Sequence, residues 1–305
     1  LSGEHVFRRF NPGIGANYNP TPVLTWFASA GQGMRVPSPV ELTCADPTAP
    51  CSLPNQFLAD PPLKPVVSRT LEAGLRARPA ERVQLSAAAY RSVLRDDIQF
   101  VTSGGAINAG FFQNLGRTLR EGIDLTATVS LGRVNLQAAY GAVRATYLTS
   151  FRIHSPSNSA RDANGDIDVL AGSRLPGIAR QSLKLHAEWK VNERAALGFG
   201  WAWFDRQFAR GDENNRDANG PLSAYGIAFL TGRYAPAKGL EISLKVDNLF
   251  NRRFETFGVL GQNFFPGPGN TFDAAAAVAE QFRSPGAPRA AWISVRYDLD
   301  EGGKR

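Results

Sequence analysis

Alternation of apolar and polar residues with a period of two runs through most of this chain and constrains its fold more than any other feature. A β-strand points successive side chains to opposite faces, so each alternating segment predicts a strand with one apolar face and one polar face. The pattern recurs in seven segments: 70–78, 123–131, 134–140, 183–191, 197–203, 239–246 and 293–299. Helical periodicity is nearly absent. The exception is 271–282, which predicts a short helix within a loop.

The connections between the alternating segments are short and long in turn. Short turns are expected at 79–81, 131–133, 191–193 and 236–239, and long polar linkers at 34–66, 102–110, 151–175, 211–221 and 259–286. This pattern indicates an antiparallel meander with tight turns at one end and large loops at the other. An outer-membrane barrel separates its loops in this way, whereas a soluble sandwich has no reason to do so.

The sequence therefore predicts an all-β fold, an antiparallel transmembrane β-barrel meander of about eleven strands. We place them at 4–10, 22–33, 67–78, 82–100, 111–130, 133–150, 176–190, 195–209, 222–235, 239–257 and 287–299. A Lys or Arg that faces lipid at the bilayer midplane costs about 2–4 kcal/mol, so the charged faces belong to a water-filled lumen. Trp189, beside a tight turn, and Tyr297 fit an interfacial aromatic girdle or, alternatively, half-buried strand positions.

Charge and catalytic residues exclude two classes of function. The net charge of +7 comes from 34 basic residues that are scattered among 27 acidic ones, and no recognition-helix pattern accompanies them, so we expect no nucleic-acid binding. The three histidines, His5, His154 and His186, lie on separate segments, and no Ser/His pair is indicated. We therefore predict that the protein is not an enzyme and needs no cofactor.

Two short polar segments carry candidate ligating or bridging residues. Cys44 and Cys51 lie in a Pro- and Ala-rich loop without a nearby histidine, which favours a loop disulfide over free thiols and thus an oxidising compartment. A second loop offers alternate oxygen ligands of the kind that Ca²⁺ takes, or else a solvated Asp/Asn turn. These four residues are Asp162, Asn164, Asp166 and Asp168.

Aromatic and basic side chains in or near the long loops are the candidate substrate contacts. The aromatic ones could stack on an organic chelate or could pack the loops against one another, and the two arginines could contact substrate or belong to a rim scaffold. The residues are Phe111, Phe112, Phe257, Phe264, Phe265, Arg252 and Arg253.

Five motifs, taken in order, resemble those of one family. They are RVPSPVEL (35–42), LKPVVSRTLEAGLR (63–76), RTLREGIDL (117–125), LPGIARQSLKL (175–185) and VDNLFNRRFETFG (246–258). Together they resemble TonB-dependent outer-membrane receptors over nearly the whole chain. The chain departs from the family pattern at Val66-Val67, where Glu is usual, and at Arg120-Glu121-Gly122, where the order is changed.

This resemblance implies a place for the chain within a larger protein. Family barrels have 22 strands behind an N-terminal plug and a TonB-contacting box, so residues 1–299 would be the C-terminal part of the barrel and 300–305 a polar tail. It also implies a Gram-negative outer membrane with its lipid, contact with the TonB complex through the missing N-terminal region, a monomer when full length, and uptake of a scarce substrate such as a ferric siderophore. The alternative is a passive porin-like or structural barrel, which would lack a plug.

Overall fold

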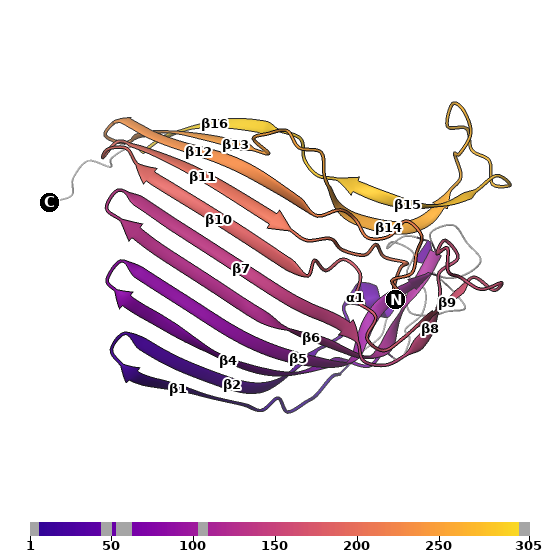
Figure 1. The fold of residues 1–305 in the computed structure, drawn as a ribbon. Coiled ribbons are helices and arrows are strands. Elements are labelled where there is room, and N and C mark those ends of the chain that lie inside the picture. The colour runs from indigo at the N-terminus through magenta and orange to yellow at the C-terminus, as the bar shows by residue number, and fades with distance from the viewer. Residues whose placement is uncertain (1–5, 44–50, 53–62, 103–108, 299–305) are drawn as a thin grey trace.

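The structure is a computed structural model that describes residues 6–43, 51–52, 63–102 and 109–298. A path of eleven antiparallel strands forms its wall (Figure 1). In chain order they are β1 (Gly13–Thr21), β2 (Leu24–Arg35), β4 (Val66–Ala80), β5 (Val83–Thr102), β6 (Ala109–Leu131), β7 (Val134–Tyr147), β10 (Gln181–Lys190), β11 (Ala195–Phe204), β12 (Tyr225–Ala237), β13 (Leu240–Asp247) and β16 (Ala290–Tyr297). The predicted all-β meander is thus confirmed.

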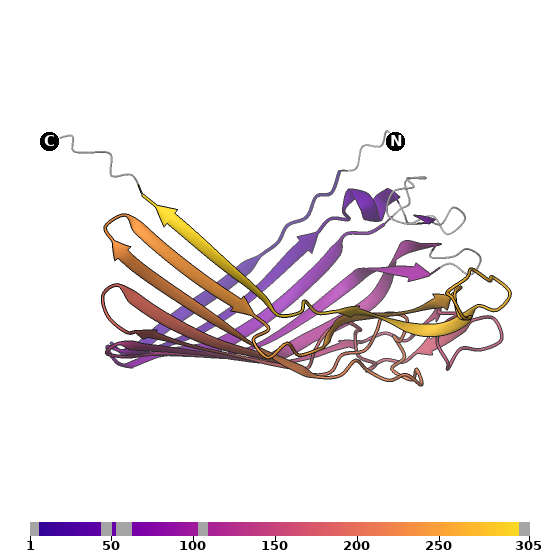
Figure 2. The same cartoon turned by 90° about the horizontal axis from the view of Figure 1, so that it is seen from above.

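The wall curves into a trough, with all of its tight turns at one end and its long connections at the other (Figure 2). Three short pairings lie off the main path. β3 (Cys51–Ser52) pairs with β6, β8 (Phe151–His154) with β9 (Asp166–Val169), and β14 (Glu255–Asn263) with β15 (Val278–Pro285). The helix α1 (Pro39–Thr43) is one turn long. Within the described ranges, no helix is long and apolar enough to cross a membrane.

Register is continuous from strand to strand and sorts the side chains into two faces. Residues directly opposite each other across antiparallel strands share a face. Ala73 lies opposite Ala89, Ala89 opposite Ile123, and Ile123 opposite Ala142, so these residues form one apolar row across four strands. We call the side of the sheet that carries this row the apolar face. The opposite side, which carries Asp124, is the polar face.

Two expected strands differ most from the observed ones. The first was expected at 4–10 but runs over Gly13–Thr21, where glycine, asparagine and proline hide the alternation that its pairing with β2 imposes. The strand expected at 239–257 stops at Asp247, because Asn248 adopts a positive φ of 46° that ends the extended backbone.

The helix expected at 271–282 was wrong. Val278–Pro285 is instead the strand β15, which pairs antiparallel with β14. The alanine run has a high helix propensity, but propensity is a weak preference that tertiary pairing overrides. The hairpin β8–β9 and most of the hairpin β14–β15 lie in segments that were expected to be long linkers, because their alternation is only four to nine residues long.

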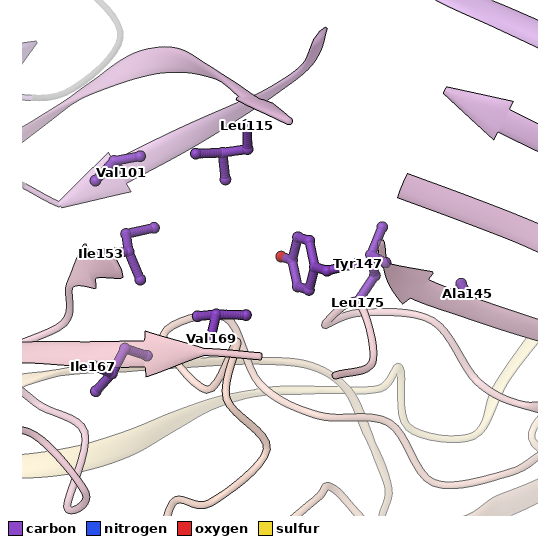
Figure 3. Packing of buried hydrophobic residues seen from close by; sticks show 8 residues of the cluster. All are labelled: Val101, Leu115, Ala145, Tyr147, Ile153, Ile167, Val169 and Leu175. Carbon is purple, nitrogen blue, oxygen red and sulfur yellow. The ribbon is translucent and has the colours of Figure 1, made fainter. Parts of the chain in front are cut away.

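Most of the buried core lies where the loops pack together at the loop end of the wall, and little of it lies toward the tight turns. Tyr147 is 1% exposed there and lies among aliphatic side chains from the strands and from the β8–β9 hairpin (Figure 3). Its hydroxyl donates to the Gln99 side-chain oxygen at 2.9 Å. The cluster comprises Val101, Leu115, Ala145, Tyr147, Ile153, Ile167, Val169 and Leu175.

Candidate functional site

Three long connections at the loop end pack against each other and form the candidate site. They run between β7 and β10 (148–180), between β11 and β12 (205–224) and between β13 and β16 (248–289). We call them the first, second and third loop, and together the loop assembly. The strand wall fixes where each loop starts and ends, so the loops meet because the wall brings their ends side by side.

Buried side chains join the first loop to the second. Asn158 is fully buried and its amide donates to the Gly211 carbonyl at 2.9 Å and to the Asn214 side-chain oxygen at 3.1 Å. The Ser159 hydroxyl and backbone N–H both donate to one oxygen of Asp217, at 3.0 and 2.9 Å. Each buried polar group is expensive to leave unpaired, so these bonds hold the two loops in one arrangement.

A second link between the same loops is reciprocal. The backbone N–H of Arg174 donates to the side-chain oxygen of Asn215 at 2.6 Å, and the Asn215 amide donates to the Arg174 carbonyl at 3.1 Å. Asn215 adopts a positive φ of 59°, a conformation that Asn tolerates better than most residues. The side chain thus imitates a strand pairing between the loops.

Backbone hydrogen bonds join the second loop to the third. The N–H of Arg210 donates to the Gly258 carbonyl at 2.9 Å, and the N–H of Leu260 donates to the Arg210 carbonyl at 2.7 Å. A small apolar cluster of Ala209, Leu222 and Leu260 lies beneath these bonds. All three loops therefore form one continuous body over this end of the wall.

The second loop holds three carboxyl groups with shifted pKa values, those of Asp212, Glu213 and Asp217. Burial raises the pKa of Asp212, whose Oδ1 accepts the N–H groups of Arg216 and Asp217 while its buried Oδ2 has no partner among the described residues. Burial also raises the pKa of Glu213. For Asp217, burial acts in the same direction, but hydrogen bonds from Ser159 and Asn219 outweigh it and the pKa is lowered.

Phe111 and Phe112 lie at the loop end of β6 and take part in packing. Phe111 is partly buried against the Tyr147 cluster. Phe112 packs against a separate cluster of Leu63, Val66 and Ile98 and meets the Phe100 ring edge-on, at 5.2 Å between centroids. Of the two interpretations that the sequence allowed, these contacts match loop packing.

The other predicted aromatic residues belong to the third loop. The Arg210 guanidinium lies over the Phe257 ring at 5.8 Å. Phe264 and Phe265 both contact Phe272, at 6.0 and 5.7 Å between ring centroids. We call these three the aromatic trio, and two of them are well exposed: Phe265 at 49% and Phe272 at 61%. Sequence reasoning missed Phe272 because it lay in the expected helix.

Arg252 and Arg253 are exposed in the turn that follows β13, and a buried asparagine shapes that turn. The Asn248 amide donates to the Arg252 carbonyl at 2.8 Å and to the Ala287 carbonyl at 3.0 Å, while its oxygen accepts the Arg252 N–H at 2.9 Å. Asn248 is 4% exposed. These contacts give the motif VDNLFNRRFETFG a structural role, because they fold the chain away from the wall.

The acidic segment between β8 and β9 is organised as a turn. The Asp162 carboxylate accepts the backbone N–H groups of Asn164 and Asp166, both at 2.9 Å, and it also pairs with Arg152. Asp166 contacts Arg152 and His154, and Asp168 is exposed. Within the described ranges, no group of three or more His, Cys, Asp or Glu side chains could hold a metal ion. The contacts match the solvated Asp/Asn turn.

Two predictions concern residues outside the described ranges. Cys44 lies outside the described residues, and of Cys51 only the backbone is described, which pairs with Gly110. The disulfide between them stays a prediction. Residues 299–305, with the expected polar tail, also lie outside the described residues.

A family model decides what this wall is. The model described as "TonB dependent receptor-like, beta-barrel" matches residues 2–249. The chain belongs to the TonB-dependent receptor β-barrel family. Barrels of this family are outer-membrane proteins of Gram-negative bacteria, so the apolar face is the lipid-facing side of the wall and the polar face lines the lumen.

The relatives are named for different substrates. The chain is 24% identical over 262 residues to the vitamin B12 transporter BtuB of Vibrio vulnificus (strain YJ016), a match that covers 86% of this chain and 36% of that protein. The siderophore receptor PiuA of Acinetobacter baumannii has a similar fold, with a TM-score of 0.63 at 17% identity over 93% of this chain and 35% of PiuA.

A third relative, the copper transporter OprC, has a TM-score of 0.64 at 19% identity over 93% of this chain and 39% of OprC. The chain thus spans between about a third and two fifths of the length of these relatives. They are receptors and transporters rather than enzymes.

Proposed function

We propose that residues 1–299 form the C-terminal part of a 22-strand TonB-dependent receptor barrel, followed by a polar tail at 300–305, and that the complete protein imports a scarce substrate. The observation that carries this proposal is the loop assembly, in which three loops are joined by hydrogen bonds over one end of a barrel wall of this family. A passive pore needs an open mouth, whereas a receptor needs a fixed surface that recognises a ligand from outside.

For the substrate we favour a ferric siderophore. The exposed rings of the aromatic trio offer flat apolar surface, and Arg252 and Arg253 are exposed cations in the same loop. Aromatic faces stack on the aromatic or conjugated groups of an organic chelate, and guanidinium groups attract its negative charge. The relative PiuA is named as a siderophore receptor, which supports the same choice. Cobalamin and copper, named for other relatives, are the competing cargoes.

The test is uptake in the native host by the complete protein. A deletion strain carrying the wild-type gene should accumulate radiolabelled iron from a ferric siderophore under iron limitation, and accumulation should stop when TonB is deleted. Parallel arms supply labelled cobalamin and copper. Uptake that persists without TonB would support the passive barrel instead, and uptake of cobalamin or copper alone would replace the siderophore.

A variant of the aromatic trio tests the substrate contact itself. The double substitution Phe265→Ala/Phe272→Ala should raise the half-saturating siderophore concentration by about fivefold or more, because each of the two aromatic contacts contributes about 0.5–1.5 kcal/mol. Phe250→Ala is the matched control, because Phe250 is 73% exposed and lies outside the trio. An equal effect of the control, or none from the double variant, would remove the trio from the binding surface.

A further inference from the structure

The lipid-facing side of the wall changes character near its loop end, in the sector formed by β4 to β7. Apolar rows cover this face from the tight turns up to the row of Ala73, Ala89, Ile123 and Ala142. Beyond that row the same face carries five arginines and one carboxylate. We call this set the arginine band, and it consists of Arg69, Arg91, Arg95, Arg117, Arg144 and Glu121.

The strand register places the arginine band on the outside of the wall. Leu71 lies opposite Arg91, Arg91 opposite Glu121, and Glu121 opposite Arg144, so these residues form the row next to the last apolar one. Arg95 lies opposite Arg117 two rows further on. Because the side-chain period of a strand is two, positions an even number of residues from Ala89 or Ile123 share their face.

The charges within the arginine band are poorly compensated. Glu121 pairs with both Arg144, at 2.5 Å, and Arg91, at 3.7 Å, so one carboxylate serves two guanidinium groups. Arg95 and Arg117 are exposed and directly opposite each other, and neither side chain has a hydrogen-bond or ion-pair partner in the described part of the chain. Like charges directly opposite across two strands are destabilising. An anion bound between the two guanidinium groups would relieve this repulsion.

The location restricts which anion can reach these arginines. An arginine on the lipid face is costly at the bilayer midplane and nearly free near the interface, so the band marks the level at which hydrocarbon gives way to headgroups. The planar guanidinium fork matches phosphate oxygens with two parallel hydrogen bonds. We propose that the arginine band binds the phosphate-bearing headgroup of an outer-leaflet lipid, with Arg95 and Arg117 sharing one phosphate.

The spacing of the arginine band fits a headgroup with more than one phosphate. Arg91 and Arg95 lie four residues apart on one face of β5, which separates them by about 13 Å along the strand. The feature is local, because the same face of β11 carries Trp201 and Trp203 near its loop end instead of arginines. The proposal rests on family membership and on the register, and it does not depend on which substrate is imported.

Native mass spectrometry of the intact detergent-solubilised protein tests this binding site. Wild-type protein should retain a diphosphorylated lipid A and should not retain phosphatidylcholine. The variant Arg95→Ala/Arg117→Ala should bind lipid A about thirtyfold more weakly, because each arginine near a membrane surface contributes about a factor of five. Arg95→Lys/Arg117→Lys keeps the positive charges but loses the planar guanidinium fork, so its affinity for lipid A should lie between those of the wild type and the double alanine variant.

The control variant is Arg76→Ala/Arg233→Ala, which removes two arginines from the polar face and should leave lipid A binding unchanged. Heat-modifiable migration in gels verifies that every variant is folded. A double alanine variant that is folded and binds lipid A as tightly as wild type would overturn the proposal. An equal loss of lipid A binding in the control variant would also overturn the proposal. Displacement of the lipid by millimolar inorganic phosphate would do the same, because it would show that the site binds free anions.

Discussion

Single residues explain how the chain leaves the wall after β13. Asn248 combines a positive φ with three hydrogen bonds from one buried side chain, and this combination suits asparagine, which tolerates the left-handed region and can donate and accept at once. The sequence showed the motif but not this role. It suggested that Arg252 and Arg253 were the residues of interest, because charge is visible in a sequence and a hydrogen-bonded turn is not.

The substitution Asn248→Ala should therefore destabilise the protein by about 2 kcal/mol, because it leaves the Arg252 N–H and two carbonyls without their partner. The measurement is the temperature at which the folded band is lost in heat-modifiable gel migration. Asn164→Ala is the control, because Asn164 is exposed and bonds to Asp162 through its backbone alone, and it should change stability by less than about 0.5 kcal/mol. Equal melting of both variants would contradict the role of Asn248.

At the scale of elements, the sequence predicted the wall well and the loops poorly. Strands such as β6 and β10 can be recognised in the sequence, because lipid on one side and water on the other require alternation over about ten residues. Loop elements obey no such constraint. Ser159 and Asp217 lie 58 positions apart and look like ordinary loop residues, and only the folded wall brings their segments together. The exposed aromatic trio was predicted in part, without Phe272.

The loop assembly should respond to pH through its second loop. Burial raises the pKa of Asp212 and Glu213, so the folded second loop binds protons more tightly than the same loop when locally unfolded. The folded loop is therefore most stable at acidic pH, and its stability decreases as pH rises through the raised pKa values. Asp217 acts in the opposite sense, because its pKa is lowered and its contribution is lost only below the ordinary aspartate range. Above that range Asp212 and Glu213 decide the trend.

Hydrogen exchange over 207–222, corrected for intrinsic rates, should show protection that falls from mildly acidic to neutral pH. Asp212→Asn removes the buried charge while keeping an oxygen for the Arg216 and Asp217 N–H groups, and it should make this dependence shallower, with Glu213 carrying the remainder. Asp168→Asn, at an exposed position outside the second loop, should leave the wild-type trend in place. An undiminished pH trend in Asp212→Asn would assign the effect to Glu213 or to groups outside the second loop.

At the scale of the whole molecule, the wall is an open trough with two edges. Within the described part of the chain, β1 pairs only with β2, and β16 pairs only with β13. An unpaired strand edge is costly in hydrocarbon, because its backbone groups have no water to bond. Under the proposal that this wall is part of a 22-strand barrel, further strands cover both edges.

Residues 1–305 produced alone should consequently fail to give a heat-modifiable, protease-resistant monomer in the outer membrane, since exposed edges also favour aggregation. Production together with the remaining barrel strands should restore that species. The measurement is gel migration with and without heating after trypsin treatment of whole cells. A resistant monomer formed by residues 1–305 alone would show that the trough closes on its own.

Under the proposed function, the bonds that join the three loops would also constrain how the receptor changes its substrate in evolution. If only one loop were replaced by that of another protein, the hydrogen-bond partners of Asn158, Ser159 and Asn215 would be lost. Polar groups in both the new loop and its neighbour would then be left unpaired. Selection therefore acts on the loops as a linked set. Recombination that exchanges all of 148–289 would preserve their mutual contacts, so we expect new specificities to be inherited with the three loops together.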